Sequence, residues 1–315
     1  MLYVSTRNTK DTYTAYRALV EITAPDGGFY VPFRLPEFTQ AEMVAFKTQS
    51  CSETVAQILN LFFGLHLTGL DVEFKIGRNP FKTETMQHKL TVAECWRNPD
   101  ASYRYLLTCL YDLMTDGNCM GNLPVGWSCI GTKIALLFGL YTVTEDIPRT
   151  LDIAVTAGDF SDLTAIAYAK KMGLPINLIV CTCGENSAFW DLVNRGEFSA
   201  NTNEFVADRP NYLECYLYHC FGADSVSQYL AVTEKKGIFY IDELQQEQLR
   251  AAVFAAVVSG SRVDTVASNM LRTTGYRLDT DSALAFGGLQ DYRSSTGINN
   301  HTLILSKKRP VSAKE

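Results

Sequence analysis

The sequence lacks a long hydrophobic run. Its longest apolar stretches, residues 134–143 and 251–258, reach about half the length that a helix needs to cross a bilayer. The first ten residues, MLYVSTRNTK, contain no apolar core of the kind found in secretory signal peptides. We therefore expect a cytoplasmic protein with no membrane partner.

The sequence also lacks an excess of basic charge. Its 28 lysines and arginines are outnumbered by 34 aspartates and glutamates, which gives a net charge of −6. Binding to nucleic acid depends on basic side chains that neutralise phosphates. We therefore expect no nucleic-acid partner.

The nine cysteines lack the spacing of a disulfide scaffold or of a zinc site. Their number is odd, and the closest pair, Cys181 and Cys183, is separated by one residue rather than two. The four histidines are dispersed. We expect thiols that pack as small apolar side chains, and no metal site.

The clearest pattern in the 315 residues is a βαβ unit over residues 151–198. The apolar run LDIAVT predicts a buried strand, the turn GDFSD precedes a helix that Gly173 ends, and INLIVCT predicts a second strand. Such a unit places its two strands parallel in one sheet. The fold class is therefore α/β. Further helices are expected at residues 41–47, 52–65, 103–114, 246–259 and 264–273.

The turn over residues 158–162 has two interpretations. Between a strand and a helix, free N–H groups and the positive helix end form a place where phosphates bind in α/β proteins. The alternative is an ordinary connecting turn. Asp159 and Asp162 would repel a phosphate at close range, so the local pattern favours the ordinary turn.

Longer segments resemble the threonine synthase family. TAGDFSDLTAIAYAKKMGLPINLIVCTCGEN is similar to the family segment that reads approximately PSGNFGD, helix, AKKMGLP, strand. Four more stretches match in order: the opening MLYVSTRN with APDGGFYVP, then ADRPNYLECYLYHCFG, TTGYRLDTDSALAF and LILSKKRPVSAKE. The resemblance implies a fold-type II pyridoxal-phosphate (PLP) enzyme architecture, tryptophan synthase beta-like, with a parallel or mixed sheet flanked by helices.

The resemblance places Arg104 where the family has its Schiff-base lysine. ECWRNPDASYRY, which begins at Glu94, lies over the family motif ELxHGPTxAFKD. A guanidinium stays charged and cannot capture the aldehyde of PLP. Shifting the alignment by one or two residues brings no lysine into place. The segment RNPFK is superficially similar to the same motif, so Lys82 is a weaker candidate for a replacement of the Schiff-base lysine.

Other family positions have changed as well. Ser161 replaces a loop glycine and Asp159 replaces an asparagine, while KKRP lies over the family's TAHP and DTDSA lacks the histidine of DPHTA. The former cofactor-binding positions that the resemblance implies are Asn98, Gly158, Asp159, Phe160, Ser161, Asp162, Ser306 and Lys307.

The resemblance also indicates that part of one α/β subdomain is deleted. Residues 107–151 bridge a gap in which the family carries an SGDTG turn and several βα units, and residues 121–128 mark the splice. We expect a truncated N-terminal threonine-synthase-like region at 1–125 and a PLP-domain-like region at 126–315. A deletion from a sheet exposes apolar surface. A second copy or a protein partner is expected to cover it, near residues 134–141.

Two functions follow from the resemblance. The first is a threonine synthase-like protein that has lost PLP catalysis and acts by binding, regulation or self-association. For this protein we expect no cofactor. The alternative is an active threonine synthase, converting O-phosphohomoserine to threonine, or a related lyase, with PLP on a lysine that does not align.

The former cleft offers one more hypothesis, an anionic small molecule. The cations that would hold it are Arg97, Arg104, Lys307, Lys308 and Arg309. Arg104 is alternatively expected to pair with Asp159 or Asp162 and fill the site.

Overall fold

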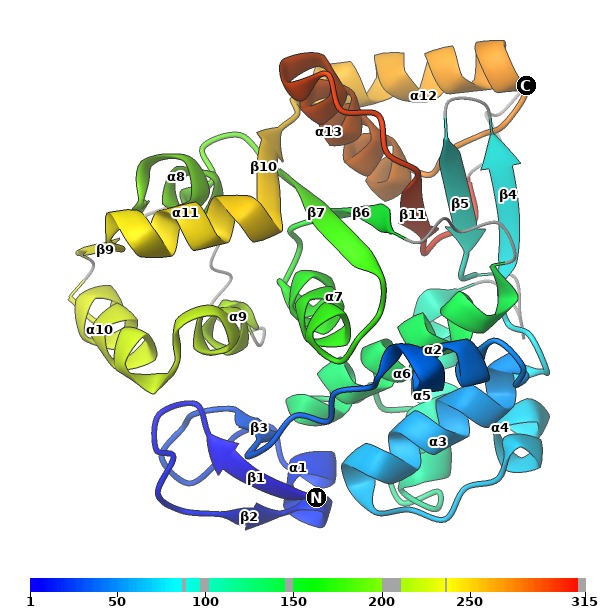
Figure 1. The fold of residues 1–315 in the computed structure, drawn as a ribbon, viewed down its shortest axis with the longest axis vertical. Coiled ribbons are helices and arrows are strands. Elements are labelled where there is room, and N and C mark those ends of the chain that lie inside the picture. Colours follow the sequence, from blue (N-terminus) through cyan, green and yellow to red (C-terminus); the bar gives the residue numbers. More distant parts are fainter. Residues whose placement is uncertain (87–88, 97–101, 145–149, 200–210, 236, 311–315) are drawn as a thin grey trace.

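A mixed sheet of six strands lies at the centre of the chain (Figure 1). The computed structural model describes residues 1–86, 89–96, 102–144, 150–199, 211–235 and 237–310. The sheet has the order β10-β7-β6-β11-β5-β4, in which β4 is antiparallel to β5 and all other neighbours are parallel. Its strands are β4 (Lys82–Met86), β5 (Leu90–Glu94), β6 (Leu151–Thr156), β7 (Ile176–Cys183), β10 (Val253–Val257) and β11 (Thr302–Ser306).

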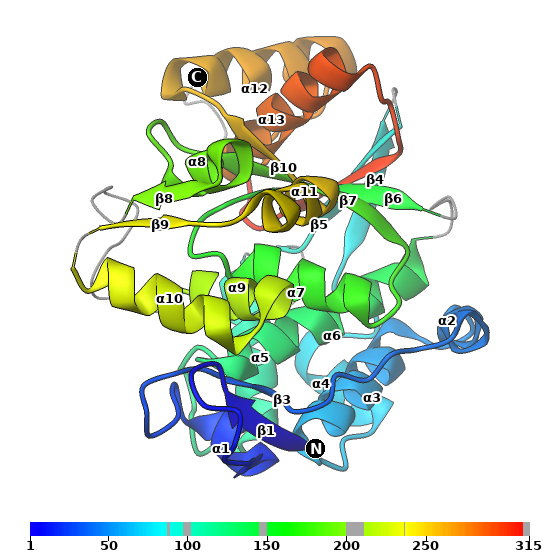
Figure 2. The same ribbon diagram turned by 60° about the vertical axis from the view of Figure 1, so that its left-hand side comes forward.

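Helices cover both faces of this sheet (Figure 2). On one face lie α12 (Gly260–Thr274) and α13 (Thr280–Thr296). On the other face lie α6 (Trp127–Val143), α7 (Ser161–Lys171), α9 (Leu213–Phe221) and α11 (Glu243–Ala252). Because side chains alternate along a strand, Ile304 packs with the first set of helices, whereas Leu303 and Leu305 belong to the larger core on the second face.

The N-terminal residues form a separate layer below the helices of the second face. Its sheet has the order β2-β1-β3, with both pairs antiparallel. The elements of this layer are β1 (Leu2–Ser5), β2 (Tyr13–Thr14), α1 (Ala15–Val20), β3 (Tyr30–Pro32), α2 (Gln40–Phe46), α3 (Cys51–Phe63), α4 (Gly69–Ile76) and α5 (Tyr103–Met114). The remaining elements are α8 (Ala188–Arg195), β8 (Glu197–Ser199), α10 (Ala223–Thr233) and β9 (Ile238–Tyr240).

The βαβ unit expected over residues 151–198 is confirmed. Strands β6 and β7 are parallel neighbours joined by α7, and the α/β class follows. The helix expected at 246–259 is wrong in its second half, because α11 ends at Ala252 and β10 follows directly. Its apolar run VFAAVV fits a buried strand as well as a helix, and pairing with β7 decides for the strand.

Helix α6 is buried on nearly all sides. Fourteen of its 17 residues are buried, among them Ile134, Leu137 and Leu140. The expectation that residues 134–141 form an uncovered surface is therefore wrong. The helix lies in the middle of the second face, where α3, α5 and α7 all pack against it.

Turns alone connect α5 to α6. Residues 115–126 contain no strand, and the expected splice at 121–128 covers the end of this connection and the first two residues of α6. Strands β4 and β5 precede residue 125 and yet pair within the central sheet. The central sheet therefore spans the division that we expected at residue 125.

Candidate functional site

The turn between β6 and α7 is closed on itself. Asp159 accepts hydrogen bonds from the backbone N–H of Ser161 at 3.0 Å and from its hydroxyl, and its own carbonyl accepts from Tyr212 N at 3.0 Å. Phe160 has a left-handed backbone (φ 65°), which is strained for a residue with a side chain. Its ring is buried against Phe189, with ring centroids 5.2 Å apart, and this packing holds the turn.

Asp162 lies between two lysines directly after this turn. Lys133 Nζ, from α6, is 3.0 Å from Asp162 Oδ1 and 2.5 Å from Ser161 Oγ. Lys307, after β11, pairs with the other carboxylate oxygen. Three elements that are distant in sequence therefore meet at the start of α7. We call Lys133, Asp162 and Lys307 the ion cluster.

The ion cluster is buried and charged. Burial alone would raise the pKa of Asp162, but the charges of Lys133 and Lys307 outweigh it and hold this pKa well below its ordinary value. Burial alone would lower the pKa of Lys133, but the charge of Asp162 raises it above its ordinary value. The ammonium group of Lys133 therefore keeps its proton at neutral pH.

These residues do not fit the phosphate of PLP. The Ser161 N–H, which would face a phosphate, is held by Asp159, and the carboxylate of Asp162 lies beside it. Gly158 keeps the positive φ of a tight turn (51°), but Ser161 adds a buried hydroxyl where the family has glycine. A phosphate would have to displace an ion pair and approach two carboxylates.

The neighbouring polar cluster is also satisfied internally. Ser306 Oγ donates to Asp279 Oδ2 at 2.7 Å and accepts from Trp96 Nε1 at 3.1 Å. Ser282 Oγ donates to the same Asp279 oxygen at 2.5 Å. Tyr276 donates its hydroxyl to Glu94 Oε1 at 2.8 Å. Ser306, which the resemblance predicts to be a former cofactor-binding position, thus joins β11 to the start of α13.

Arg104 does not reach the ion cluster. Its side chain is exposed on the first turn of α5, and within the described residues it forms no ion pair with Asp159 or Asp162. The expected pairing is therefore wrong. The helix begins at Tyr103, capped by Ser102, so that Tyr103 turns inward and Arg104 turns toward solvent.

The other cations of the former cleft are dispersed or paired. Lys308 pairs with Asp281 at 3.0 Å, and Arg309 is exposed. Lys82 lies on the edge strand β4, half exposed and paired with Glu84. Arg97 and Asn98 lie outside the described residues.

Sequence reasoning missed Lys133 as the occupant of this site. The signal was one lysine within the otherwise apolar stretch GWSCIGTKIALLFG, where a charge needs a partner. Which partner it has depends on the packing of α6 against α7.

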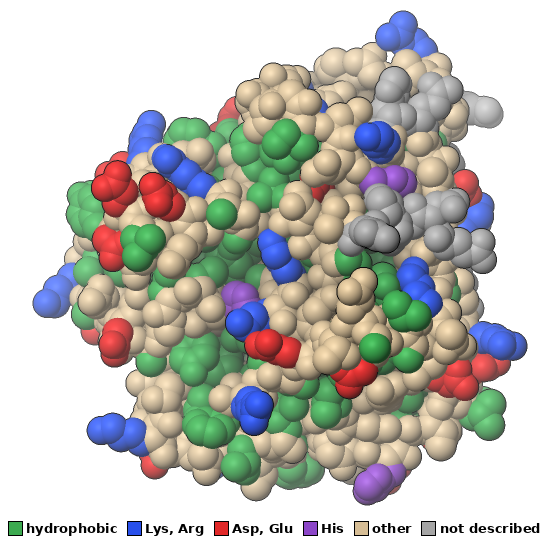
Figure 3. Space-filling view, in the orientation of Figure 1, with side chains coloured by type: hydrophobic (Ala, Val, Ile, Leu, Met, Phe, Trp, Pro, Cys, Tyr) green, Lys and Arg blue, Asp and Glu red, His purple; other side chains and the backbone are tan. Residues whose placement is uncertain are grey.

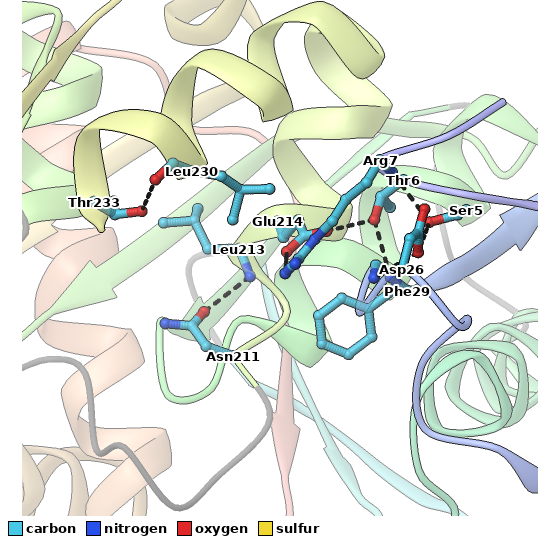
Figure 4. Close-up of polar contacts among 11 residues, drawn as sticks. Ser5, Thr6, Arg7, Asp26, Phe29, Asn211, Leu213, Glu214, Leu230 and Thr233 are labelled. Carbon is cyan, nitrogen blue, oxygen red and sulfur yellow. Dashed lines mark hydrogen bonds and ion pairs between the residues drawn. The ribbon is translucent and has the colours of Figure 1, made fainter. Parts of the chain in front are cut away.

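A second polar cluster joins the N-terminal layer to α9 (Figure 4). Glu214 accepts from Arg7 Nε at 3.1 Å and Nη2 at 2.9 Å, and also from the Thr6 hydroxyl. Thr6 Oγ1 in turn accepts from Phe29 N at 2.9 Å. Ser5 donates to Asp26 at 2.7 Å. Each group has a partner within the chain, which indicates a structural role.

In the described part of the chain, no three side chains of the metal-binding types gather as a metal site would require. All nine cysteines are free thiols. Within the same residues no helix combines the length and apolar character needed to cross a bilayer.

Comparison with known proteins identifies the architecture. A family model for the threonine synthase N terminus matches residues 2–76. The PLP-bound threonine synthase of Brucella melitensis superimposes with a TM-score of 0.81 at 17% identity, over 98% of this chain and 89% of that one. The yeast enzyme gives a TM-score of 0.78 at 15% identity, over 98% and 87%.

Curated relatives match over shorter stretches. Threonine synthase-like 1 of Homo sapiens is 23% identical over 145 residues, which cover 43% of this chain and 20% of the relative. Threonine synthase of Methylobacillus glycogenes is 30% identical over 83 residues, 25% of this chain and 18% of that one. The matched stretch thus spans about a fifth of these relatives. Residues 2–76 therefore match the threonine synthase N terminus, and the chain has the fold-type II architecture of the threonine synthases over almost its whole length.

Proposed function

We propose that this protein is a threonine synthase relative that does not carry out PLP catalysis and acts by binding, through self-association or a protein partner. The observation that carries the proposal is the ion cluster. Lys133, Asp162 and Lys307 satisfy one another at the start of α7, where a cofactor phosphate would have to bind.

The lysines of this region support the proposal in a second way. Imine formation needs an amine that has lost its proton. Lys133 is the buried lysine beside the turn, and the negative charge of Asp162 keeps its amine protonated. Arg104, at the family's lysine position, cannot lose its charge under these conditions.

Trapping with PLP tests the proposal. The folded protein would be incubated with equimolar PLP, reduced with borohydride and measured by intact mass, with urea-unfolded protein as the control in which every lysine is accessible. We expect no stoichiometric adduct on the folded chain. An adduct that maps to one buried lysine would overturn the proposal.

The alternative is an active threonine synthase that uses a lysine outside the aligned motif. The buried position of Lys133 is the observation that favours it. This alternative requires phosphate release from O-phosphohomoserine in the presence of added PLP, and loss of that release in Lys133→Met. We expect no release from either protein.

The binding role has support on α4. Leu70 and Phe74, one helical turn apart, have 77% and 89% of their surfaces exposed, which is unusual for large apolar side chains. We expect the chain to dimerise in sedimentation velocity as its concentration rises, and Leu70→Glu with Phe74→Glu to remain monomeric. A wild-type chain that stays monomeric at every concentration would exclude self-association, and the proposed binding role would then require a different protein partner.

A further inference from the structure

A cavity of about 660 Å³ lies on the side of α7 that faces α9 and α11. Strand β7 closes it from behind through Ile179. The space-filling view shows a hollow in this part of the surface, with hydrophobic side chains inside and charged side chains at its edge (Figure 3). Its volume is within the range of pockets that hold small organic molecules.

The cavity has an apolar part beside the polar and charged side chains that also line it. Ile179 and Leu249 are core residues that line its wall. Phe221, the last residue of α9, lines it as well. The space exists because small residues, Ala167 on α7 and Ala252 on α11, stand where larger side chains would fill it. This interior suits the hydrocarbon part of a ligand.

The rim carries an excess of positive charge. Lys170 donates to the carbonyl of Asn177 at 2.5 Å. Within the described residues no carboxylate forms an ion pair with it, although the charge of the buried Asp152 acts on it. Lys171 is 3.5 Å from Glu37, and both side chains are about 60% exposed. Two lysines and one glutamate leave one positive charge at the entrance.

His219 provides a neutral polar group on the wall. Its ring lies against that of Tyr168, with centroids 4.4 Å apart. Burial, together with the charge of Lys171, lowers the pKa of His219 to about 4. The imidazole is therefore uncharged at neutral pH and adds no charge to the rim.

We propose that this cavity binds a small molecule with one carboxylate and an apolar aliphatic or aromatic body. The carboxylate would lie at Lys170 and Lys171, and the body would lie against Ile179, Phe221 and Leu249. A dianion fits less well, because the two lysines and Glu37 leave one net positive charge at the rim, which a single carboxylate already neutralises.

This site is separate from the ion cluster. Asp162 lies in the first turn of α7, whereas Lys170 lies eight residues further along the helix, about 12 Å away at the rise of an α-helix. The inference therefore does not depend on the loss of PLP catalysis.

An NMR titration tests the proposal on the full chain. The protein has four histidines, so the ring signals are few, and His219→Asn identifies the one from this wall. The probes are phenylacetate and hexanoate, with phenylacetamide and hexanamide as neutral analogues of the same shape. We expect both carboxylates to shift the His219 signal saturably, and the amides to bind roughly tenfold more weakly because they lack the charge.

Variants separate the site from general binding. Lys170→Gln with Lys171→Gln should weaken the carboxylates roughly tenfold and leave the amides unchanged. Ala252→Phe should abolish binding by filling the cavity. Lys235→Gln, which removes an exposed lysine outside the cavity, should change nothing. Equal binding of acids and amides, binding that survives Ala252→Phe, or no saturable shift would each overturn the proposal.

Discussion

At the scale of single residues, Asp162 holds two cations that have no other carboxylate partner within the described residues. Asp162→Asn keeps the shape of the side chain but leaves two buried or half-buried ammonium groups unpaired. Breaking such a buried pair costs about 3 kcal/mol or more. We expect urea unfolding at pH 7 to show a loss of this size. Asp191→Asn, which breaks the exposed pair with Arg195, should cost less than about 1 kcal/mol.

The pH dependence of this difference follows from the pKa of Asp162. The folded chain holds this pKa below the ordinary Asp value of 3.8, so the carboxylate stabilises the fold above that pH. The stabilisation is lost as the pH falls through the folded pKa and the carboxylate is protonated. The difference between wild type and Asp162→Asn should therefore begin to shrink below about pH 4 and decrease further as the pH falls. A difference that stays constant from pH 7 to pH 3 would contradict the assignment.

The variant Arg104→Lys tests whether restoring a lysine at the family's Schiff-base position is enough to restore reaction with PLP. The new amine would lie at the family's lysine position, but on the solvent side of α5. The turn before α7, in addition, does not fit the phosphate of PLP. We expect PLP and borohydride to label it no more than Arg272→Lys, a matched change at an exposed position of α12. Peptide mapping of the reduced adducts makes the comparison. Preferential labelling at residue 104 would show that the cofactor still binds.

How much of the site could be predicted differs from residue to residue. The turn over 158–162 and its two aspartates were predictable, because a strand, a turn and a helix follow one another in sequence. The ion cluster was not, because Lys133 and Lys307 reach Asp162 from elements 29 and 145 residues away. The alignment gave the position of Arg104 but not its direction, which depends on where α5 begins.

At the scale of elements, the sequence was ambiguous where an apolar run was short. The apolar pattern of residues 253–257 fits a strand and a buried helix equally well. In the structure these residues pair with β7 and therefore form a strand. The apolar run of α6 is compatible with an uncovered surface, but the structure surrounds this helix with other helices. An apolar sequence says that a segment is covered, not what covers it.

Close packing of α6 on α3 gives a prediction at this scale. A Cβ at Gly139 would lie 2.8 Å from both Cys51 Sγ and Val55 Cγ2, so one helix must shift. Gly139→Ala should lower the unfolding free energy by about 1–2 kcal/mol, because overpacking exceeds the gain of up to about 1 kcal/mol in helix propensity. Gly260→Ala, in α12 with open space around it, should be neutral or stabilising. Thermal unfolding of the two variants compares them, and equal effects would contradict the packing argument.

At the scale of the whole molecule, the N-terminal layer is joined to the rest by contacts between distant segments. The resemblance predicted that the opening belongs to the threonine synthase N terminus, and the family match over residues 2–76 confirms it. It did not predict that Thr6 and Arg7 contact Glu214, which lies more than 200 residues further along the sequence. Contacts of this kind follow from the docking of complete layers.

Removing Glu214 should loosen this layer before the rest of the chain. Glu214 is 5% exposed and accepts two hydrogen bonds from the Arg7 guanidinium, so Glu214→Ala loses a charge-assisted pair worth about 2 kcal/mol. The central sheet does not use this contact. Hydrogen exchange should therefore accelerate in β1 and β3, and remain slow in β6 and β7. Glu247→Ala, an exposed change on α11, should leave both regions unchanged. Equal acceleration of β1 and β6 in Glu214→Ala would mean that the N-terminal layer and the central sheet open together, and that Glu214 stabilises the molecule as one unit.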